Sequence, residues 1–377
     1  MTVHSLKKLA ELGQSVWYDF IRRDLIQTGK LERLIRQDGL AGMTSNPTIF
    51  QKAVGETDLY DEDIRRLGAQ GKDAAEIFEG LAVRDVQSAA DVFRPVYEET
   101  GGNDGFVSIE VAPKLARDTE GTIEEARRLW AACARPNVMV KIPGTKEGLR
   151  AIRASLVAGI NINITLLFSV QRHREVMEAY LSAMEERVSK GLPVDHLRSV
   201  ASFFVSRVDT NADKKIDAKA KTGSEKEGAL ARRLRGKLGV ANARIAYEAF
   251  EEVFGGDRFG ALQKKGVRLQ RPLWASTSTK DPSLPDLYYV EALIAPNTVD
   301  TMPPETFDAY RDHGDPKIRI REDLAGAHAV FTGLEELGIE GDAIFRELED
   351  EGIQKFSDSF DALLKMVAEK EKAVRSA

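Results

Sequence analysis

The sequence predicts an α/β fold, a closed (β/α)8 TIM barrel with additional helices at the N- and C-termini. Two observations support this fold class. Short apolar runs alternate with longer amphipathic stretches, which is the pattern of a parallel sheet covered by helices. Eight such runs occur, and the 377 residues exceed the roughly 250 that a barrel of this kind needs. No Gly/Ser-rich or Pro-rich linker divides the sequence, so we expect residues 1–377 to form a single domain.

The expected strands are compact, rich in Val, Ile and Phe, and mostly end in a polar residue. In chain order they are Val16–Asp19, Leu40–Thr44, Phe106–Val111, Val138–Ile142, Ile160–Leu166, Val200–Val205, Leu273–Ala275 and Ala292–Ala295.

The expected helices lie between and after these strands, with apolar residues recurring on one face. They include Asp85–Glu99, Thr122–Ala134, Gln171–Lys190, Asn242–Glu252, Asp323–Leu337 and Asp342–Glu369. A highly charged insertion at about 211–238 is expected to be a solvated surface excursion. The C-terminal helices, at about 323–369, are expected to cover the barrel.

Composition excludes several classes of protein. Apolar residues make up 42% and charged residues 30%, as in soluble globular proteins, and the net charge of −6 gives no support for nucleic-acid or membrane-surface binding. The single cysteine, Cys133, cannot form an intramolecular disulfide. One cysteine and only five histidines are also few ligands for a structural zinc site, which makes such a site improbable. No signal peptide or membrane span is evident. We therefore expect a cytoplasmic protein without a metal or other cofactor; its oligomeric state, monomer or homodimer, stays open.

Polar residues cluster at the expected C-terminal strand ends, where barrel enzymes hold their catalytic groups. Lys141 is flanked by apolar residues in VMVKIPGT. An ammonium that points into a barrel is expensive to desolvate, which favours the free amine that a Schiff-base nucleophile needs. The alternative is a lysine that extends out of the strand end into water. Asp19 and Glu110 could supply acid–base catalysis beside the amine, or could simply cap the following turns.

Further polar residues follow the later strands. Asn163 and Thr165 alternate with isoleucines and so share one face of their strand. Arg207 and Lys280 lie near the ends of the sixth and seventh strands, a common place for a phosphate site; the alternative is two solvated surface cations. The sequence contains no GxGxxG, GxxxxGK[ST], HExxH or GxSxG motif, so nucleotide-binding, zinc-protease and serine-hydrolase functions lack support.

Five sequence blocks, taken together, resemble the transaldolase family, in particular its longer bacterial and plant-type branch. They are TSNPTIFQKA, VSIEV, VKIPGTKEGL, INITLLFS and ASFFVSRVD, and they occur in the family's order over the first two-thirds of the chain. The resemblance implies transfer of a dihydroxyacetone unit from sedoheptulose 7-phosphate to glyceraldehyde 3-phosphate, giving erythrose 4-phosphate and fructose 6-phosphate in the non-oxidative pentose phosphate pathway.

The resemblance also implies roles for individual residues. Lys141 would form the Schiff base, Glu110 with Thr165 would move protons through a water, and Asp19 would act on the hydroxyl beside the bond that breaks. The three-carbon unit would be held by Asn46, Asn163 and Ser202, and the phosphate by Arg207 and Lys280. Shorter family members carry Arg where Lys280 aligns.

Two alternatives remain at this stage. One is a fructose 6-phosphate aldolase, a lyase on the same fold; those relatives have Gln and Tyr at the positions of Glu110 and Phe204. A phenol could orient a water for hydrolytic release, whereas the Phe204 ring cannot donate that hydrogen bond, so the sequence favours the transferase. The other is a non-catalytic barrel, which fold alone cannot exclude.

Overall fold

The computed structural model describes residues 5–376, and its centre is a closed barrel of eight parallel strands in the order β1 to β8, with β1 paired to β8. This confirms the predicted fold class. The strands are β1 (Gln14–Asp19), β2 (Gly42–Thr44), β3 (Phe106–Glu110), β4 (Val138–Pro143), β5 (Ile162–Leu167), β6 (Ser199–Phe204), β7 (Gln270–Ala275) and β8 (Thr298–Met302).

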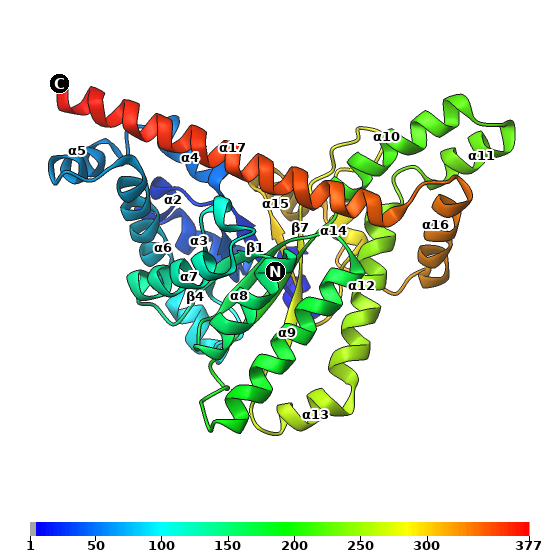
Figure 1. The fold of residues 1–377 in the computed structure, drawn as a ribbon, viewed down its shortest axis with the longest axis horizontal. Coiled ribbons are helices and arrows are strands. Elements are labelled where there is room, and N and C mark those ends of the chain that lie inside the picture. Colours follow the sequence, from blue (N-terminus) through cyan, green and yellow to red (C-terminus); the bar gives the residue numbers. More distant parts are fainter. Residues whose placement is uncertain (1–4, 377) are drawn as a thin grey trace.

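Helices surround the barrel and continue beyond it at the C-terminus (Figure 1). They are α1 (Ser5–Glu11), α2 (Arg23–Gln27), α3 (Lys30–Asp38), α4 (Pro47–Gly55), α5 (Asp61–Ala69), α6 (Ala74–Glu99), the 3₁₀ turn η1 (Pro113–Leu115), α7 (Thr119–Cys133), α8 (Lys146–Val157), α9 (Val170–Ser189), α10 (Ser206–Thr222), α11 (Glu225–Leu234), α12 (Leu238–Gly255), α13 (Asp257–Gln263), α14 (Tyr288–Ala292), α15 (Pro304–His313), α16 (Leu324–Glu336) and α17 (Gly341–Ser376). None of these described helices is both long and apolar enough to cross a membrane.

The strand residues alternate between two apolar layers. Side chains such as Val140, Ile142 and Ile164 belong to the layer between barrel and helices. Trp17 and Met139 belong to a second cluster, which fills the barrel interior together with Phe106, Val200, Leu273 and Val299. Because successive strand side chains point to opposite faces, each strand that buries an interior apolar residue also points a residue two positions further on into the barrel mouth.

Helix starts follow local capping chemistry. Asp73 and Glu76 form a reciprocal capping box, so α6 begins at Ala74, eleven residues before the expected start at Asp85. Thr145 caps α8 and Ser169 caps α9, each accepting a hydrogen bond from a backbone N–H of the first turn. These caps fix the points at which the chain leaves the barrel mouth.

The prediction of the eighth strand at Ala292–Ala295 is wrong. That run closes α14 and continues as a buried turn, while β8 is Thr298–Met302. The sequence TVDTM has few apolar residues, but each of its polar side chains makes at least one hydrogen bond inside the protein, although Asp300 Oδ2 has no partner among the described residues. Thr298 donates to the Ala295 carbonyl, and Thr277 donates to Asp300 Oδ1 at 2.9 Å. A strand can therefore be fully buried with only Val299 and Met302 as its apolar residues.

Two surrounding segments were singled out in the sequence. The charged segment 211–238, expected to be a solvated surface excursion, forms most of α10 and all of α11; many of its side chains are exposed, and those that are buried include Ile216, Ala231 and Leu234. The C-terminal helices are present as α16 and α17. In Figure 1, α17 runs along one end of the molecule, and it packs against α4, α5, α6, α10 and β5.

Candidate active site

Lys141 points into the barrel. Its strand, β4, is buried along its whole length, and the side chains on either side of Lys141 face the helices. Lys141 is 5% exposed; its Nζ donates to the Ser45 carbonyl at 2.9 Å and lies 3.2 Å from Glu110 Oε2. The alternative of a lysine extending into water is therefore wrong. The amine is buried between one carbonyl and one carboxylate.

Glu110 ends β3 and is the register partner of Lys141 on the neighbouring strand. Its side chain is 6% exposed, and burial raises the pKa of Glu110 although the charge of Lys141 lowers it. A carboxyl group with a raised pKa beside an amine can take a proton and return it during a reaction.

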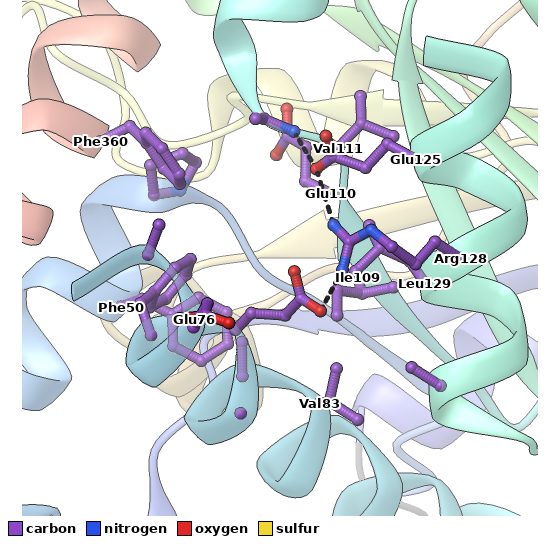
Figure 2. Close-up of a pocket in the computed structure, with 18 of the residues that line it drawn as sticks. Phe50, Glu76, Val83, Ile109, Glu110, Val111, Glu125, Arg128, Leu129 and Phe360 are labelled. Carbon is purple, nitrogen blue, oxygen red and sulfur yellow. Dashed lines mark hydrogen bonds and ion pairs between the residues drawn. The ribbon is translucent and has the colours of Figure 1, made fainter. Parts of the chain in front are cut away.

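Glu110 also borders a cavity of about 590 Å³ that lies outside the barrel, between α4, α6, α7 and α17. Figure 2 shows this cavity, with Phe50, Phe360 and Leu129 along its walls. Glu125 accepts from the Ala112 N–H at 2.9 Å, just after Glu110, and thereby fixes the turn that follows β3.

Asp19 ends β1 on the other side of the mouth. Thr44 Oγ1 donates to Asp19 Oδ1 at 2.7 Å and lies 2.7 Å from Thr301 Oγ1. Burial raises the pKa of Asp19, whereas the charge of Lys141 and the Thr44 hydrogen bond lower it. The carboxylate is thus held by a threonine from the next strand and can accept a proton from a group in the cavity.

The small polar residues form a short chain across β3, β5 and β6. Ser202 Oγ donates to Asn163 Oδ1 at 2.7 Å, and Asn163 Nδ2 donates to Ser108 Oγ at 3.0 Å. Asn163 is fully buried beneath the cavity and positions Ser202, which lines it. Thr165 lines the cavity as well, and its buried Oγ1 has no hydrogen-bond partner in the described chain. Such a hydroxyl is free to bind a water or a substrate oxygen.

Asn46 caps α4. Its Oδ1 accepts from the Ile49 N–H at 3.0 Å, so the amide is fixed with its nitrogen available to a ligand. The turn that holds it is part of TSNPTIFQKA, in which Pro47 occupies the first helical position.

These residues surround a cavity of about 460 Å³ at the C-terminal ends of the strands. Of the ten residues expected in the site, eight line it: Asp19, Asn46, Lys141, Thr165, Ser202, Phe204, Arg207 and Lys280. The other two lie behind this wall, Glu110 against Lys141 and Asn163 against Ser202.

The cationic side of the cavity centres on Arg207, the second residue of α10. Its guanidinium carbon lies 5.2 Å from the Phe204 ring centre and 5.9 Å from that of Phe356, and burial lowers the pKa of Arg207. Within residues 5–376 this guanidinium has no hydrogen-bond or ion-pair partner. It is therefore placed by two rings and left free to bind an anion. Lys280 lines the same cavity and is exposed.

Sequence reasoning missed several residues of this cavity. Thr44 precedes Asn46 by two positions and could have been inferred from the same block. Lys52, one turn further along α4, is a third cation at the cavity. Thr301 belongs to the strand that was misplaced, and Phe356 comes from α17, so neither had a local signal.

Comparison with known proteins gives one consistent result. The family model described as Transaldolase/Fructose-6-phosphate aldolase matches residues 16–367. A protein of Thermobifida fusca named Transaldolase is 48% identical over 367 residues, covering 97% of each chain. A Transaldolase of Saccharopolyspora erythraea is 48% identical over 98% of each chain, and one of Trichodesmium erythraeum is 44% identical over 99% of each.

Proposed function

The chain belongs to the transaldolase/fructose-6-phosphate aldolase family, and from this premise we propose that it acts as a transaldolase with Lys141 as its Schiff-base nucleophile. The reaction moves a dihydroxyacetone unit from sedoheptulose 7-phosphate to glyceraldehyde 3-phosphate, in the pentose phosphate pathway. The observation that carries the residue assignment is the position of Lys141: inside the barrel, 5% exposed, 3.2 Å from Glu110 and on the wall of the cavity.

The first steps need a neutral amine and a proton carrier. In this proposal Lys141 Nζ adds to the ketose carbonyl and the resulting carbinolamine loses water to give the iminium. Glu110, in contact with Nζ, takes the proton from the amine and supplies the one that leaves with the hydroxyl. The unpaired hydroxyl of Thr165 holds the water through which these protons move.

Carbon–carbon cleavage requires a base at the adjacent hydroxyl. Asp19 removes that proton, the bond electrons move into the iminium, and an aldehyde leaves while an enamine stays on Lys141. The enamine then attacks the acceptor aldehyde, and Asp19 returns the proton to the new alkoxide. Asn46, Asn163 and Ser202 bind or position the hydroxyls of the three-carbon unit, and Arg207, Lys280 and Lys52 bind phosphate.

The family name also covers fructose 6-phosphate aldolase. Phe204 favours the transferase, because its ring lines the cavity and lies against Arg207, where it offers no hydroxyl to orient water on the intermediate. In the test, purified protein is incubated with fructose 6-phosphate, with and without erythrose 4-phosphate. A transaldolase forms sedoheptulose 7-phosphate and glyceraldehyde 3-phosphate when the acceptor is present. Sustained release of free dihydroxyacetone without an acceptor would identify a lyase.

The wider proposal keeps three expectations from the sequence. The substrates are sugar phosphates, the chain is a single domain, and the protein is cytoplasmic. The single-domain expectation is supported by α17, which packs against α4, α5 and α6 from the first third of the chain as well as α10 from its second half. Sedimentation of the purified protein would give its oligomeric state.

A further inference from the structure

A cavity of about 630 Å³ lies at the opposite end of the barrel from the candidate active site. Its walls come from the segments that lead into β3, β6, β7 and β8, that is, from the N-terminal strand ends. In Figure 1 this end is marked by α13, and α17 lies at the other. The residues that line the cavity are Thr100, Gly101, Asn103, Arg198, Gln263, Gly266, Val267, Arg268, Leu269, Arg271 and Asn297.

Three of these residues are arginines, and no Asp or Glu is among the described residues of the lining. The chain as a whole carries a net charge of −6, so this local excess of positive charge opposes the global balance. Lys264 and Lys265, on the segment that carries Arg268, are exposed and add to it.

Arg271 has a structural explanation. Its Nη2 donates to Asp104 Oδ1 at 2.9 Å and its Nη1 to Ser15 Oγ at 2.8 Å, while Trp17 Nε1 donates to the same carboxylate. This buried ion pair closes the lower end of the barrel, and its two charges cancel.

Arg198 has no such compensation. It is 5% exposed and donates to three main-chain carbonyls, those of Asp195 and Leu197 from Nη1 and that of Gly101 from Nη2. A guanidinium carries five N–H donors, so two are left over, and Nε is buried without a partner. Within residues 5–376 no carboxylate lies within ion-pair distance. The nearby Asp195 side chain is 79% exposed and contacts His196 instead.

Arg268 supplies a second positive charge, on an exposed side chain at the edge of the cavity. Its guanidinium has no hydrogen-bond or ion-pair partner in the described chain, although its own carbonyl accepts from Tyr180 at 2.6 Å, which fixes the backbone. Burial, followed by the charge of Arg268, lowers the pKa of Arg198. A buried guanidinium without a carboxylate partner, with a second arginine at the edge of the same cavity, favours the binding of an anion between them.

We propose that this cavity is a second anion site, at which Arg198 and Arg268 bind a phosphate group, either inorganic phosphate or a phosphate monoester. The guanidinium fork matches phosphate oxygens, and Arg198 is already oriented by its three carbonyl contacts. A bound phosphate would join the segments before β3, β6 and β7. Because it would bind the folded chain alone, it would raise thermal stability. The proposal does not depend on the reaction assigned above.

The test measures phosphate binding by isothermal titration calorimetry with the active-site cations removed. The background combines Arg207→Ala, Lys280→Ala and Lys52→Ala, which removes the three phosphate-binding cations proposed for the active site. The ligands are inorganic phosphate and fructose 6-phosphate in separate titrations. We expect one phosphate per chain in this background, weakened roughly tenfold or more by Arg268→Ala, since that change removes a charge-assisted hydrogen bond. The matched control is Lys264→Ala, which alters a neighbouring exposed cation outside the lining and should change affinity less than twofold.

Binding of inorganic phosphate alone would identify the free ion as the ligand, and binding of both would include the monoester. If two phosphates bind the background, the active-site assignment is wrong, but loss of one of them in Arg268→Ala still supports this site. At the same phosphate concentration, phosphate should also raise the Tm of the background more than that of its Arg268→Ala derivative. The proposal would be overturned if Arg268→Ala did not weaken phosphate binding, or if Arg268→Ala and Lys264→Ala weakened it equally.

Discussion

Replacing Arg207 tests how the proposed site recognises phosphorylated sugars. Its guanidinium lies against Phe204 and Phe356, at 5.2 and 5.9 Å from the ring centres, and has no partner in the described chain. Arg207→Ala therefore breaks no existing ion pair of the folded protein. The substitution should therefore weaken substrate binding and leave the stability of the fold nearly unchanged, because the substrate phosphate loses a hydrogen-bond donor.

The size of the effect follows from the contacts. A hydrogen bond to a charged group contributes about 1.5–3 kcal/mol, so Arg207→Ala should raise KM for fructose 6-phosphate roughly 10- to 150-fold. Phe356→Ala removes one stacked ring from Arg207. A cation–π contact is worth about 0.5–1 kcal/mol when exposed and about 2 kcal/mol when desolvated, which corresponds to a rise in KM of roughly two- to thirtyfold for this partly buried pair.

The assay is steady-state kinetics with fructose 6-phosphate and erythrose 4-phosphate, repeated with unphosphorylated fructose as donor. Arg207→Ala should raise KM for the phosphorylated donor and leave kcat/KM for fructose nearly unchanged. Arg172→Ala is a matched control, since Arg172 pairs with Glu175 at 2.8 Å and does not line the cavity. An unchanged KM for fructose 6-phosphate in a folded Arg207→Ala protein would refute this view of phosphate recognition.

Three other predictions address the second cations, a buried acid and metals. Lys280→Ala should raise KM for both sugar phosphates about tenfold, and Lys280→Arg should keep most of the affinity. Lys52→Ala should also raise KM, by a smaller factor. An unchanged KM in Lys280→Ala would show that Lys280 does not bind the substrate phosphate. Burial raises the pKa of Asp300 to about 7, from 3.8, so its contribution to stability is complete below pH 3.8 and is lost as pH rises through 7. In urea unfolding, the free energy of unfolding should therefore fall by roughly 4 kcal/mol between pH 4 and 8 because of this group. In Asp300→Asn this pH dependence should be weaker, and an equal pH dependence in the two proteins would contradict the assignment. EDTA should leave activity intact, because an iminium can serve as the electron sink, and restoration of lost activity by Zn²⁺ would indicate a different mechanism.

Much of the fold and site could be predicted because the relevant signals are local. Short apolar runs predict seven of the eight strands. The sequence also marks Lys141, because a charged residue flanked by apolar ones on both sides must either leave the strand or face the barrel interior. Parallel strands also bring their C-terminal ends together, so polar residues at those ends were expected to meet.

The remaining features depend on contacts between distant segments. The residue pattern does not reveal β8, because Thr277 donates to Asp300 and Thr298 donates to the Ala295 carbonyl, and a pattern of residue types does not show these contacts. Phe356 reaches the cavity from α17 only after the barrel has closed. The arginines at the opposite end are also far apart in the sequence, since Arg198 and Arg268 precede different strands and come together only because β6 pairs with β7.

The central claim, that Lys141 is the nucleophile, is tested most directly by borohydride reduction in the presence of fructose 6-phosphate, followed by peptide mass spectrometry. The account predicts a reduced three-carbon or six-carbon adduct on Lys141 in the wild-type chain. Neither Lys141→Ala nor Lys141→Arg should form an adduct, because a guanidinium stays protonated and does not add to a carbonyl. An adduct on another cavity lysine, Lys52 or Lys280, or a trapped product in either Lys141 variant, would contradict the account.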